Sequence, residues 1–279
     1  MPNEDVKSDR VIVSAGTYGS PAILMRSGLG PADELRALGI AVLEDLAGVG
    51  QNLTDHPLFE LSFAARCPTQ PDPVPAFQTV LTFRSSTTAQ GHDLQILPRS
   101  IIGEGSVSAR FVLFASVLKP LSRGRLRLRS PNPAAPPLID LGYFTNPVDM
   151  PRMVEAVRVA RRLAQTAPLS SWVIEETYPG SQITDSQNEL EAAIRGAIAT
   201  YHHPVGTCAM GPLTDAGAVV DPQGNVHGVE GLAVIDAPIM PTIPAANTNL
   251  PTIMLAERCA AFLAGRTPQR HSIGRRAHE

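Results

Sequence analysis

The chain has 279 residues, of which 43% are hydrophobic, so it is long enough to form one large domain or two ordinary ones with a buried core. Its 23 basic and 26 acidic residues give a formal net charge of -3, which argues against a nucleic acid or an anionic membrane as the partner. We therefore expect a small-molecule ligand.

Membrane spans and cysteine-based sites are not predicted. No apolar run approaches the roughly 18 residues that a membrane helix needs, and the opening MPNEDVKSDR is charged where a signal peptide would be apolar. We therefore expect a cytoplasmic protein. Cys67, Cys208 and Cys259 lie far apart and form no CxxC pair, so we expect separate reduced thiols, without a disulfide framework or a metal site.

The first predicted unit is a strand followed by helices. Residues 10–16, RVIVSAG, form a short apolar, β-branched run, which predicts a strand buried on both faces of a parallel sheet. Helical patterns follow from Ser20 and over residues 31–40, where Pro31 suits the first helical position. This order is typical of a βα unit.

Separated strand-like runs follow from about Pro57, at residues 93–97, 110–118 and 124–130, and predict an antiparallel sheet. In RGRLRLRS, residues 123–130, arginines alternate with glycine or leucine, so the charges share one face of the strand. We favour a solvated face over an anion-binding face for these arginines, which are Arg123, Arg125, Arg127 and Arg129.

A long helix is predicted after the sheet. Residues 146–167 carry methionine, valine and leucine at helical spacing, with Asn146 or Asp149 as the N-cap. We expect this helix to pack on the sheet.

The last predicted elements are a strand and a helix. Residues 231–241 form another buried-strand run, and residues 251–265 form an apolar helix that Gly265 closes. The tail after this helix is expected to be disordered.

The run TYHHPVGTCAMG, residues 200–211, holds two of the seven histidines. Adjacent residues point in different directions, so His202 and His203 are not expected to bind one metal together. From the residues alone, a histidine in such a glycine- and proline-rich turn is more often a structural hydrogen-bonding group than a catalytic one.

Five segments of the sequence resemble motifs of one family, and they occur in that family's order. The five segments are GTYGSPAILMRSGLG (16–30), GVGQNLTDHP (48–57), YHHPVGTCAMG (201–211), VHGVEGLAVIDAPIMP (226–241) and AANTNLPTIMLAE (245–257). The family that they resemble is that of the glucose-methanol-choline oxidoreductases, the FAD-dependent alcohol oxidases and dehydrogenases. The resemblance covers residues 10–265, with 60–195 matching more by layout than by motif.

The resemblance implies the catalytic residues. His203 occupies the position of the histidine that lies next to the flavin and handles the proton of the substrate hydroxyl, and His202 flanks it. Asn249 occupies the position of the histidine or asparagine that completes the pair. Histidine suits a base because its pKa is near neutral pH, and an imidazolium or the Asn249 amide can donate to a developing alkoxide.

The resemblance also implies residues that bind FAD. Asp236 and Ala237 fall on the loop that passes the phosphates and ribityl chain of the flavin, and Pro238 stands where relatives often have serine. The dipole of the helix that opens at Pro251, with free amides from Thr252 onward, could stabilise the negative charge of a reduced flavin. The resemblance further assigns Ala15, Gly16 and Asn249 to the cofactor site, whereas Cys208 and His227 are expected to be structural.

The glycine-rich GxGxxG loop with which relatives bind the FAD phosphates does not occur in this sequence. We therefore expect an α/β chain with a partial FAD-binding Rossmann-like domain and an α+β substrate domain with an antiparallel sheet. The predicted segments are an FAD-binding part (1–60), a substrate-binding domain (61–197), an FAD-binding return segment with the catalytic histidine (198–267) and a disordered tail (268–279).

Three functions remain open from the sequence. The first is part of an FAD-dependent oxidoreductase that oxidises the CH–OH group of a small alcohol, with an N-terminal FAD-binding half as its partner. The second is a non-enzymatic remnant or binding module without flavin, and the third a flavin-containing lyase of the same family. No residue decides between oxidase and dehydrogenase.

Overall fold

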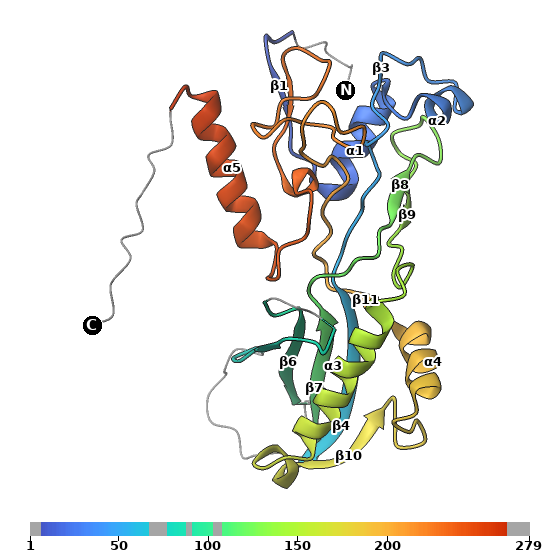
Figure 1. The fold of residues 1–279 in the computed structure, drawn as a ribbon, viewed down its shortest axis with the longest axis vertical. Coiled ribbons are helices and arrows are strands. Elements are labelled where there is room, and N and C mark those ends of the chain that lie inside the picture. Colours follow the sequence, from blue (N-terminus) through green and yellow to red (C-terminus); the bar gives the residue numbers. More distant parts are fainter. Residues whose placement is uncertain (1–6, 67–76, 88–90, 103–107, 267–279) are drawn as a thin grey trace.

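A computed structural model describes residues 7–66, 77–87, 91–102 and 108–266. The chain forms two regions that lie end to end, each with its own hydrophobic core (Figure 1). We call them the sheet region, built mainly from residues 57–200, and the loop-rich region, built from both ends of the chain and from residues 125–140. The predicted domain boundaries stay a prediction, and the tail at 268–279 lies outside the described residues.

The loop-rich region holds short strands, three α-helices and one 3-10 helix. They are β1 (Val11–Val13), α1 (Gly16–Arg26), β2 (Leu29–Gly30), α2 (Ala32–Ala37), β3 (Glu44–Asp45), β8 (Arg125–Arg127), β9 (Leu138–Asp140), β12 (Leu232–Val234), the 3-10 helix η2 (Ala237–Ile239) and α5 (Asn249–Leu263).

The sheet region holds six strands and the remaining helices. They are β4 (Pro57–Arg66), β5 (Leu81–Phe83), β6 (Leu94–Ile102), β7 (Ser108–Val117), α3 (Asp149–Ala164), the 3-10 helix η1 (Leu169–Ser171), β10 (Val173–Tyr178), α4 (Gln187–Ala197) and β11 (Ala199–Thr200).

The six-stranded sheet is antiparallel throughout, as the sequence predicts. Its order is β10-β4-β7-β6-β5, and β11 also pairs with β4. Side chains alternate between the two faces along each strand, so Phe59, Leu61 and Phe63 of β4 point into the core. Helix α3 packs on this face and contributes the fully buried Met153 and Val157. The chain is therefore a mixed α/β protein.

The start of α3 differs from the prediction. Val148 is the N-cap and makes no side-chain cap, while Asn146 and Asp149 do not cap the helix. Asp149 is the first helical residue, and its carboxylate accepts the amide hydrogens of Leu121 and Ser122 instead. A buried carboxylate is thereby used to hold the preceding loop against the helix.

The arginine-rich strand β8 is not part of the large sheet, contrary to the prediction. It pairs with β9 in a two-stranded ribbon, and Leu126 and Leu128 are buried in the core of the loop-rich region. Arg125, Arg127 and Arg129 are exposed, as predicted, whereas Arg123 is partly buried and donates to the Asn52 side-chain oxygen and the Pro120 carbonyl.

Strands β1 and β12 pair in parallel although they come from opposite ends of the chain. The prediction of a strand buried on both faces is wrong for the described residues, because Val11 and Ile12 are about half exposed (52% and 48%). These two strands have no further strand beside them among the described residues. Pro31 is the N-cap of α2 and not its first residue.

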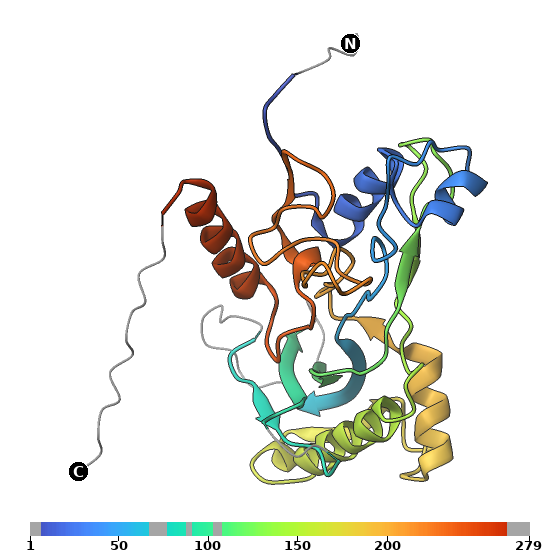
Figure 2. The ribbon, with the colours of Figure 1, turned by 45° about the horizontal axis from the view of Figure 1, so that its top comes forward.

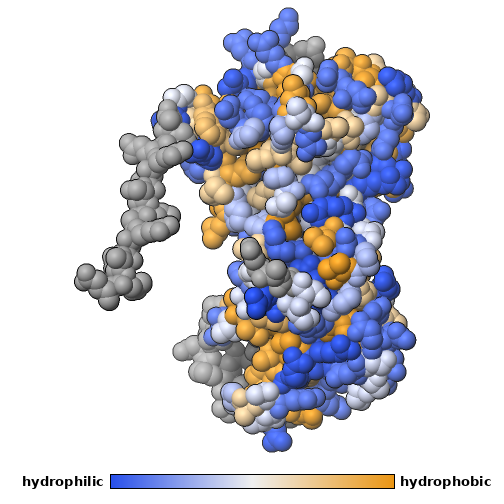
Figure 3. All heavy atoms as spheres, viewed as in Figure 1, coloured by the Kyte–Doolittle hydropathy of each residue, from blue (hydrophilic) through white to orange (hydrophobic). Residues whose placement is uncertain are grey.

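Helix α5 begins at Asn249, two residues before the predicted start. Gly265 follows its C-cap with φ of +65°, a left-handed conformation that closes the helix as predicted. The 3-10 helix η2 lies between α5 and α1 in both ribbon views (Figures 1 and 2). Hydrophobic surface is visible along α5 (Figure 3), where Leu250, Ile253 and Met254 are exposed.

No helix among the described residues is long and apolar enough to cross a membrane. Cys208 and Cys259 are free, buried thiols. Cys67 lies outside the described residues.

Candidate active site

Two segments of the predicted motifs run antiparallel where the two regions meet. Residues 50–56 pair with residues 201–207: the amides and carbonyls of Thr54 and Val205 exchange two hydrogen bonds of 3.0 and 2.8 Å. The Tyr201 amide donates to the His56 carbonyl at 3.1 Å. This pairing continues the β4–β11 contact, and it brings the first motif beside the histidine motif.

A turn at His202 separates the two adjacent histidines. His202 has φ of +61°, which is the left-handed region, and its side chain is exposed. His203 is 9% exposed and points inward. The amide of His202 donates to the Thr200 hydroxyl at 2.9 Å, which holds the turn. The predicted divergence of the two side chains is therefore found.

Asp55 holds His203 in place. It is 2% exposed, and its Oδ1 atom accepts the backbone N–H of His203 at 3.0 Å. Its Oδ2 atom accepts the hydroxyl of Tyr143 at 2.9 Å and also the hydroxyl of Thr200. Burial and the Asp55 charge raise the pKa of Tyr143, so its phenol stays a donor. One carboxylate thus ties three segments of the chain together.

The His203 loop is also tied to α1. The hydroxyl of Thr17 donates to the Pro204 carbonyl, and the hydroxyl of Thr207 donates to the Thr17 carbonyl, both at 2.6 Å. Thr17 and Thr207 are buried. The histidine is therefore anchored on the loop-rich region as well as on the sheet region.

His56 and His203 contact each other directly. Their Nδ1 atoms lie 3.0 Å apart, and the rings are nearly perpendicular at 87°. The Nε2 atom of His56 lies 2.9 Å from the Leu118 carbonyl oxygen and 3.1 Å from that of Pro244. His56 has no exposed surface.

These contacts fix the tautomers. A carbonyl oxygen only accepts hydrogen bonds, so Nε2 of His56 carries a hydrogen, and a neutral His56 must then accept at Nδ1. His203 therefore donates its Nδ1–H to His56. A neutral His203 then has its lone pair on Nε2, which has no hydrogen-bond partner among the described residues.

Burial keeps both imidazoles neutral. Desolvation, aided by the neighbouring His203, lowers the pKa of His56 to about 3. Desolvation also lowers the pKa of His203, while the Asp55 charge acts in the opposite direction. A neutral His203 with a free Nε2 lone pair is able to accept a proton.

Asp236 contacts Gly16, which the resemblance also assigns to the cofactor site, and Ser20. Its Oδ2 atom accepts the Gly16 amide at 2.6 Å and the Ser20 hydroxyl at 2.8 Å. Its Oδ1 atom is buried and has no hydrogen-bond partner in the described structure. Burial raises the pKa of Asp236, although these two donors oppose the shift. The Asp236 carboxylate is thus held in place through Oδ2, and Oδ1 remains able to accept a hydrogen bond.

The neighbours of Asp236 lie on the two turns that it links. Ala15 is exposed at the N-cap of α1, and its amide donates to the Ser20 hydroxyl. A side chain on Gly16, which has φ of +79°, would meet no atom within 4 Å. Ala237 opens η2 and is partly buried, and Pro238 is buried. Open space therefore lies beside the β1–α1 turn.

The residues at the start of α5 differ in part from the prediction. The Thr252 amide donates to the Thr248 carbonyl at 2.9 Å and is not one of the free amides, because the helix begins at Asn249 and Thr252 is its fourth residue. Within the described structure, the amides of Asn249 and Leu250 are the ones without a partner. The Asn249 side chain is exposed and makes no hydrogen bond to His203 among the described contacts.

Sequence reasoning missed Asp55, His56 and Tyr201. The first two stand in the motif GVGQNLTDHP, so the signal was present, but their contact with His203 depends on the fold. Cys208 is fully buried, which raises the pKa of its thiol. His227 is a turn histidine whose Nε2 lies 3.0 Å from the Gly211 carbonyl oxygen, which agrees with its predicted structural role.

Comparison with known proteins identifies the family. Two family models described as GMC oxidoreductase match residues 120–256 and 2–58. The chain belongs to the GMC oxidoreductase family. Both histidine segments of the candidate site lie inside the matched residues.

Relatives within the GMC oxidoreductases include dehydrogenases and oxidases. The chain is 36% identical to an alcohol dehydrogenase [acceptor] from Pseudomonas putida and 34% identical to oxygen-dependent choline dehydrogenase 1 from Chromohalobacter salexigens, in each case over 92% of this chain and 51% of the relative. Its fold matches pyridoxine 4-oxidase from Mesorbium loti with a TM-score of 0.83 and 30% identity, covering 93% of this chain and 52% of that one. The chain thus spans about half the length of the relatives it matches.

Proposed function

We propose that the full-length protein containing this chain is an FAD-dependent oxidoreductase that oxidises the CH–OH group of an alcohol. In this proposal His203 accepts the proton of the substrate hydroxyl. The observation that carries it is the contact between His56 and His203, because it leaves the Nε2 lone pair of a neutral His203 free. The alcohol and choline dehydrogenases among the relatives support an alcohol as the substrate.

Each group at the site has a separate role in the proposed reaction. Bound FAD supplies the hydride acceptor. His203 takes the hydroxyl proton at Nε2, and Asp55 and His56 hold its backbone and its ring. The exposed Asn249 amide is available as the donor for a developing alkoxide, as the family resemblance implies.

The residues of this chain fit a flavin. The unused Oδ1 atom of Asp236 is an acceptor for a hydroxyl such as those of a ribityl chain, and space is open beside Gly16. The free amides of Asn249 and Leu250, at the positive end of the α5 dipole, suit a group that gains negative charge. Ala15, Ala237 and Pro251 lie on the same turns and are assigned to this cofactor site.

We assign the FAD phosphates to a segment outside this chain. The chain spans about half of its relatives and holds no GxGxxG loop. We place that FAD-binding half on a surface of exposed apolar side chains from β1 and α5. These side chains are Val11, Ile12, Leu250, Ile253 and Met254. Strands of that half would pair with β1 and extend the parallel β1–β12 pair into a larger sheet. The exposed apolar side chains would then be buried.

The test is visible absorption of the full-length protein, followed by anaerobic addition of primary alcohols. We expect a retained flavin band that an alcohol bleaches, with the matching aldehyde as the product. A protein that takes up no flavin even with FAD in excess would contradict the proposal and favour a binding module. A flavin that stays oxidised while a substrate is cleaved would favour a lyase.

A further inference from the structure

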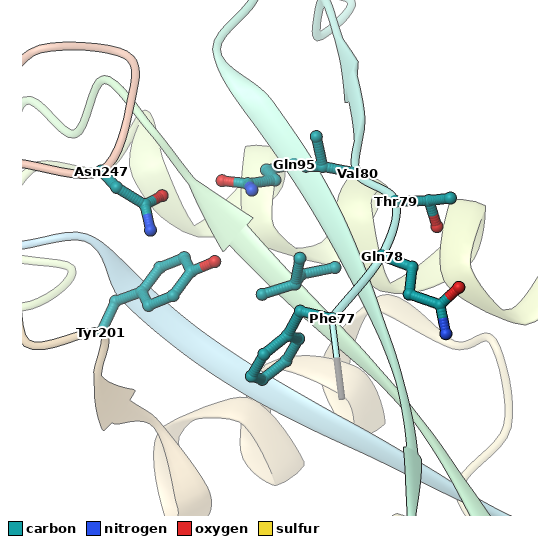
Figure 4. A pocket seen from close by; sticks show the side chains of 8 residues that line it. Phe77, Gln78, Thr79, Val80, Gln95, Tyr201 and Asn247 are labelled. Carbon is teal, nitrogen blue, oxygen red and sulfur yellow. The ribbon is translucent and has the colours of Figure 1, made fainter. Parts of the chain in front are cut away.

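A cavity of about 430 Å³ lies at the edge of the sheet region, and Tyr201, whose ring contacts that of His203, forms part of its wall. Tyr201 and Asn247 form one side, and Gln95 with residues 77–80 forms the other (Figure 4). Ligand pockets for small molecules measure about 300–1,000 Å³, so this cavity suits a compact ligand.

The alternation of side chains on β6 explains how the cavity is lined. Leu94 and Ile96 are fully buried against the core under α3. Gln95 and Leu97 point to the opposite face and line the cavity. Gln95 is 6% exposed, so an amide is held in a largely dry position on a regular strand.

Tyr201 links the cavity to His203. The two rings lie 4.4 Å apart between centroids and are tilted by 33°. The hydroxyl of Tyr201 points into the cavity, beside the Gln95 amide but without a well-formed hydrogen bond. Burial raises the pKa of this phenol to about 12, so the group is a neutral donor at physiological pH.

Among the described residues that line the cavity, none has a charged side chain. The polar groups are neutral amides and hydroxyls, chiefly Gln95, Tyr201 and Asn247. Apolar walls come from Leu97 and from Phe77 and Val80, which are 46% and 54% exposed and therefore available to cover an apolar ligand. The nearby cation of Arg99 packs on the Phe77 ring at 5.4 Å and does not line the cavity.

We propose that this cavity is the substrate site and that it selects an uncharged alcohol with an aromatic or similarly sized apolar body. The apolar body lies against Phe77, Val80 and Leu97, and a neutral polar substituent bonds to Gln95, Tyr201 or Asn247. A charged substrate would lose its hydration there without a partner of opposite charge, which is costly. This inference rests on the proposed function, since it assigns the substrate of the same site.

The test compares three alcohols of similar shape on the full-length, flavin-loaded protein. They are benzyl alcohol, para-carboxybenzyl alcohol, which is an anion, and para-aminomethylbenzyl alcohol, which is a cation. We expect kcat/KM for anaerobic flavin reduction to be at least about tenfold higher for the neutral alcohol than for either charged one.

A variant places a charge in the cavity. Gln95→Glu should raise the preference for the cationic alcohol over the neutral one by about tenfold or more and disfavour the anion further. Asn247→Asp places a carboxylate on the opposite, exposed side and should act in the same direction, so it serves if Gln95→Glu does not fold. Gln165→Glu, on the exposed end of α3, is the matched control and should leave the ratios unchanged.

The outcomes separate this inference from the proposed function. Three results would overturn the substrate assignment without contradicting the proposed oxidoreductase function. They are a preference for a charged alcohol, equal rates for all three alcohols, and rate ratios that neither cavity variant changes. If no alcohol bleaches the flavin, the proposed function fails. The flavin difference spectrum then still tests the cavity: it should report binding of neutral benzyl alcohol that Gln95→Glu weakens, and no such binding would overturn the cavity as a ligand site.

Discussion

The Nδ1 atoms of His56 and His203 lie 3.0 Å apart, and the far nitrogen of His56 faces two carbonyl oxygens. The two carbonyl oxygens only accept hydrogen bonds, so they fix the hydrogen of His56 on Nε2. The Nδ1 atom of His56 is then the acceptor for the Nδ1–H of His203. His56 thereby determines which nitrogen of His203 carries the lone pair. In the proposed reaction His56 is a positioning residue, and His203 is the base.

The role of His56 predicts a difference between two replacements. His56→Leu removes the acceptor for the His203 Nδ1–H, so both tautomers of His203 become accessible, and we expect kcat to fall by about tenfold or more. His56→Asn offers a side-chain oxygen near the position of Nδ1 and should recover part of this loss. The comparison is made by anaerobic flavin reduction at saturating alcohol. Equal kcat in both variants, or no loss in either, would contradict the positioning role.

The pH dependence follows from the lowered pKa of His203. The base works only when neutral, and its pKa lies below the ordinary value of 6.5 because of burial. We therefore expect kcat/KM to be flat above about pH 6.5 and to fall as the pH drops through a lower value. Asp55 acts to raise this pKa, so Asp55→Asn should move the acid limb to still lower pH. A shift of the limb to higher pH in this variant would contradict the electrostatic account.

Asp236 is expected to contribute to FAD affinity. Its free Oδ1 atom is an acceptor, and Asp236→Asn puts a donor amide there if the amide oxygen keeps the Gly16 and Ser20 contacts. We predict about tenfold weaker FAD binding, corresponding to about 1.4 kcal/mol. Asp33→Asn, in an exposed ion pair with Arg36, is the control and should leave FAD binding unchanged. Unchanged affinity in Asp236→Asn would remove Asp236 from the cofactor site.

The buried ion pairs of Arg152 are expected to stabilise the sheet region. Arg152 contacts Asp93 at 2.6 Å and Asp149 at 3.1 Å, and all three side chains are at most 4% exposed. Arg152→Met leaves these buried carboxylates without their cation and should lower the free energy of unfolding by about 3–5 kcal/mol. Arg158→Met, on the same helix α3 and partly exposed, should cost under about 1 kcal/mol. Chemical denaturation of both variants makes the comparison, and similar losses would contradict the account.

The sequence predicts the parts of this molecule that depend on local pattern and on family motifs. The antiparallel sheet follows from the β-strand runs, α3 from its helical spacing, and the end of α5 from Gly265. His203 is singled out because it stands in a motif that occurs in order with four others.

What the sequence does not predict depends on contacts between distant segments. His56 and His203 are 147 positions apart, and only the pairing of residues 50–56 with 201–207 brings their rings together. The predicted cap of α3 is wrong because Asp149 holds the preceding loop instead of capping the helix. The predicted place of β8 in the large sheet is wrong because alternation alone does not show which strand is the partner.

The most direct test of the central claim compares the two adjacent histidines by the same substitution. His203→Asn and His202→Asn are introduced into the full-length protein, and anaerobic bleaching of the flavin by an alcohol is followed in each. Asparagine tolerates the left-handed backbone at position 202. We predict that His203→Asn slows bleaching by about 10²-fold or more with flavin content unchanged, while His202→Asn stays within about threefold of the wild type. Equal rates in the wild type and His203→Asn would contradict the assignment of His203 as the base.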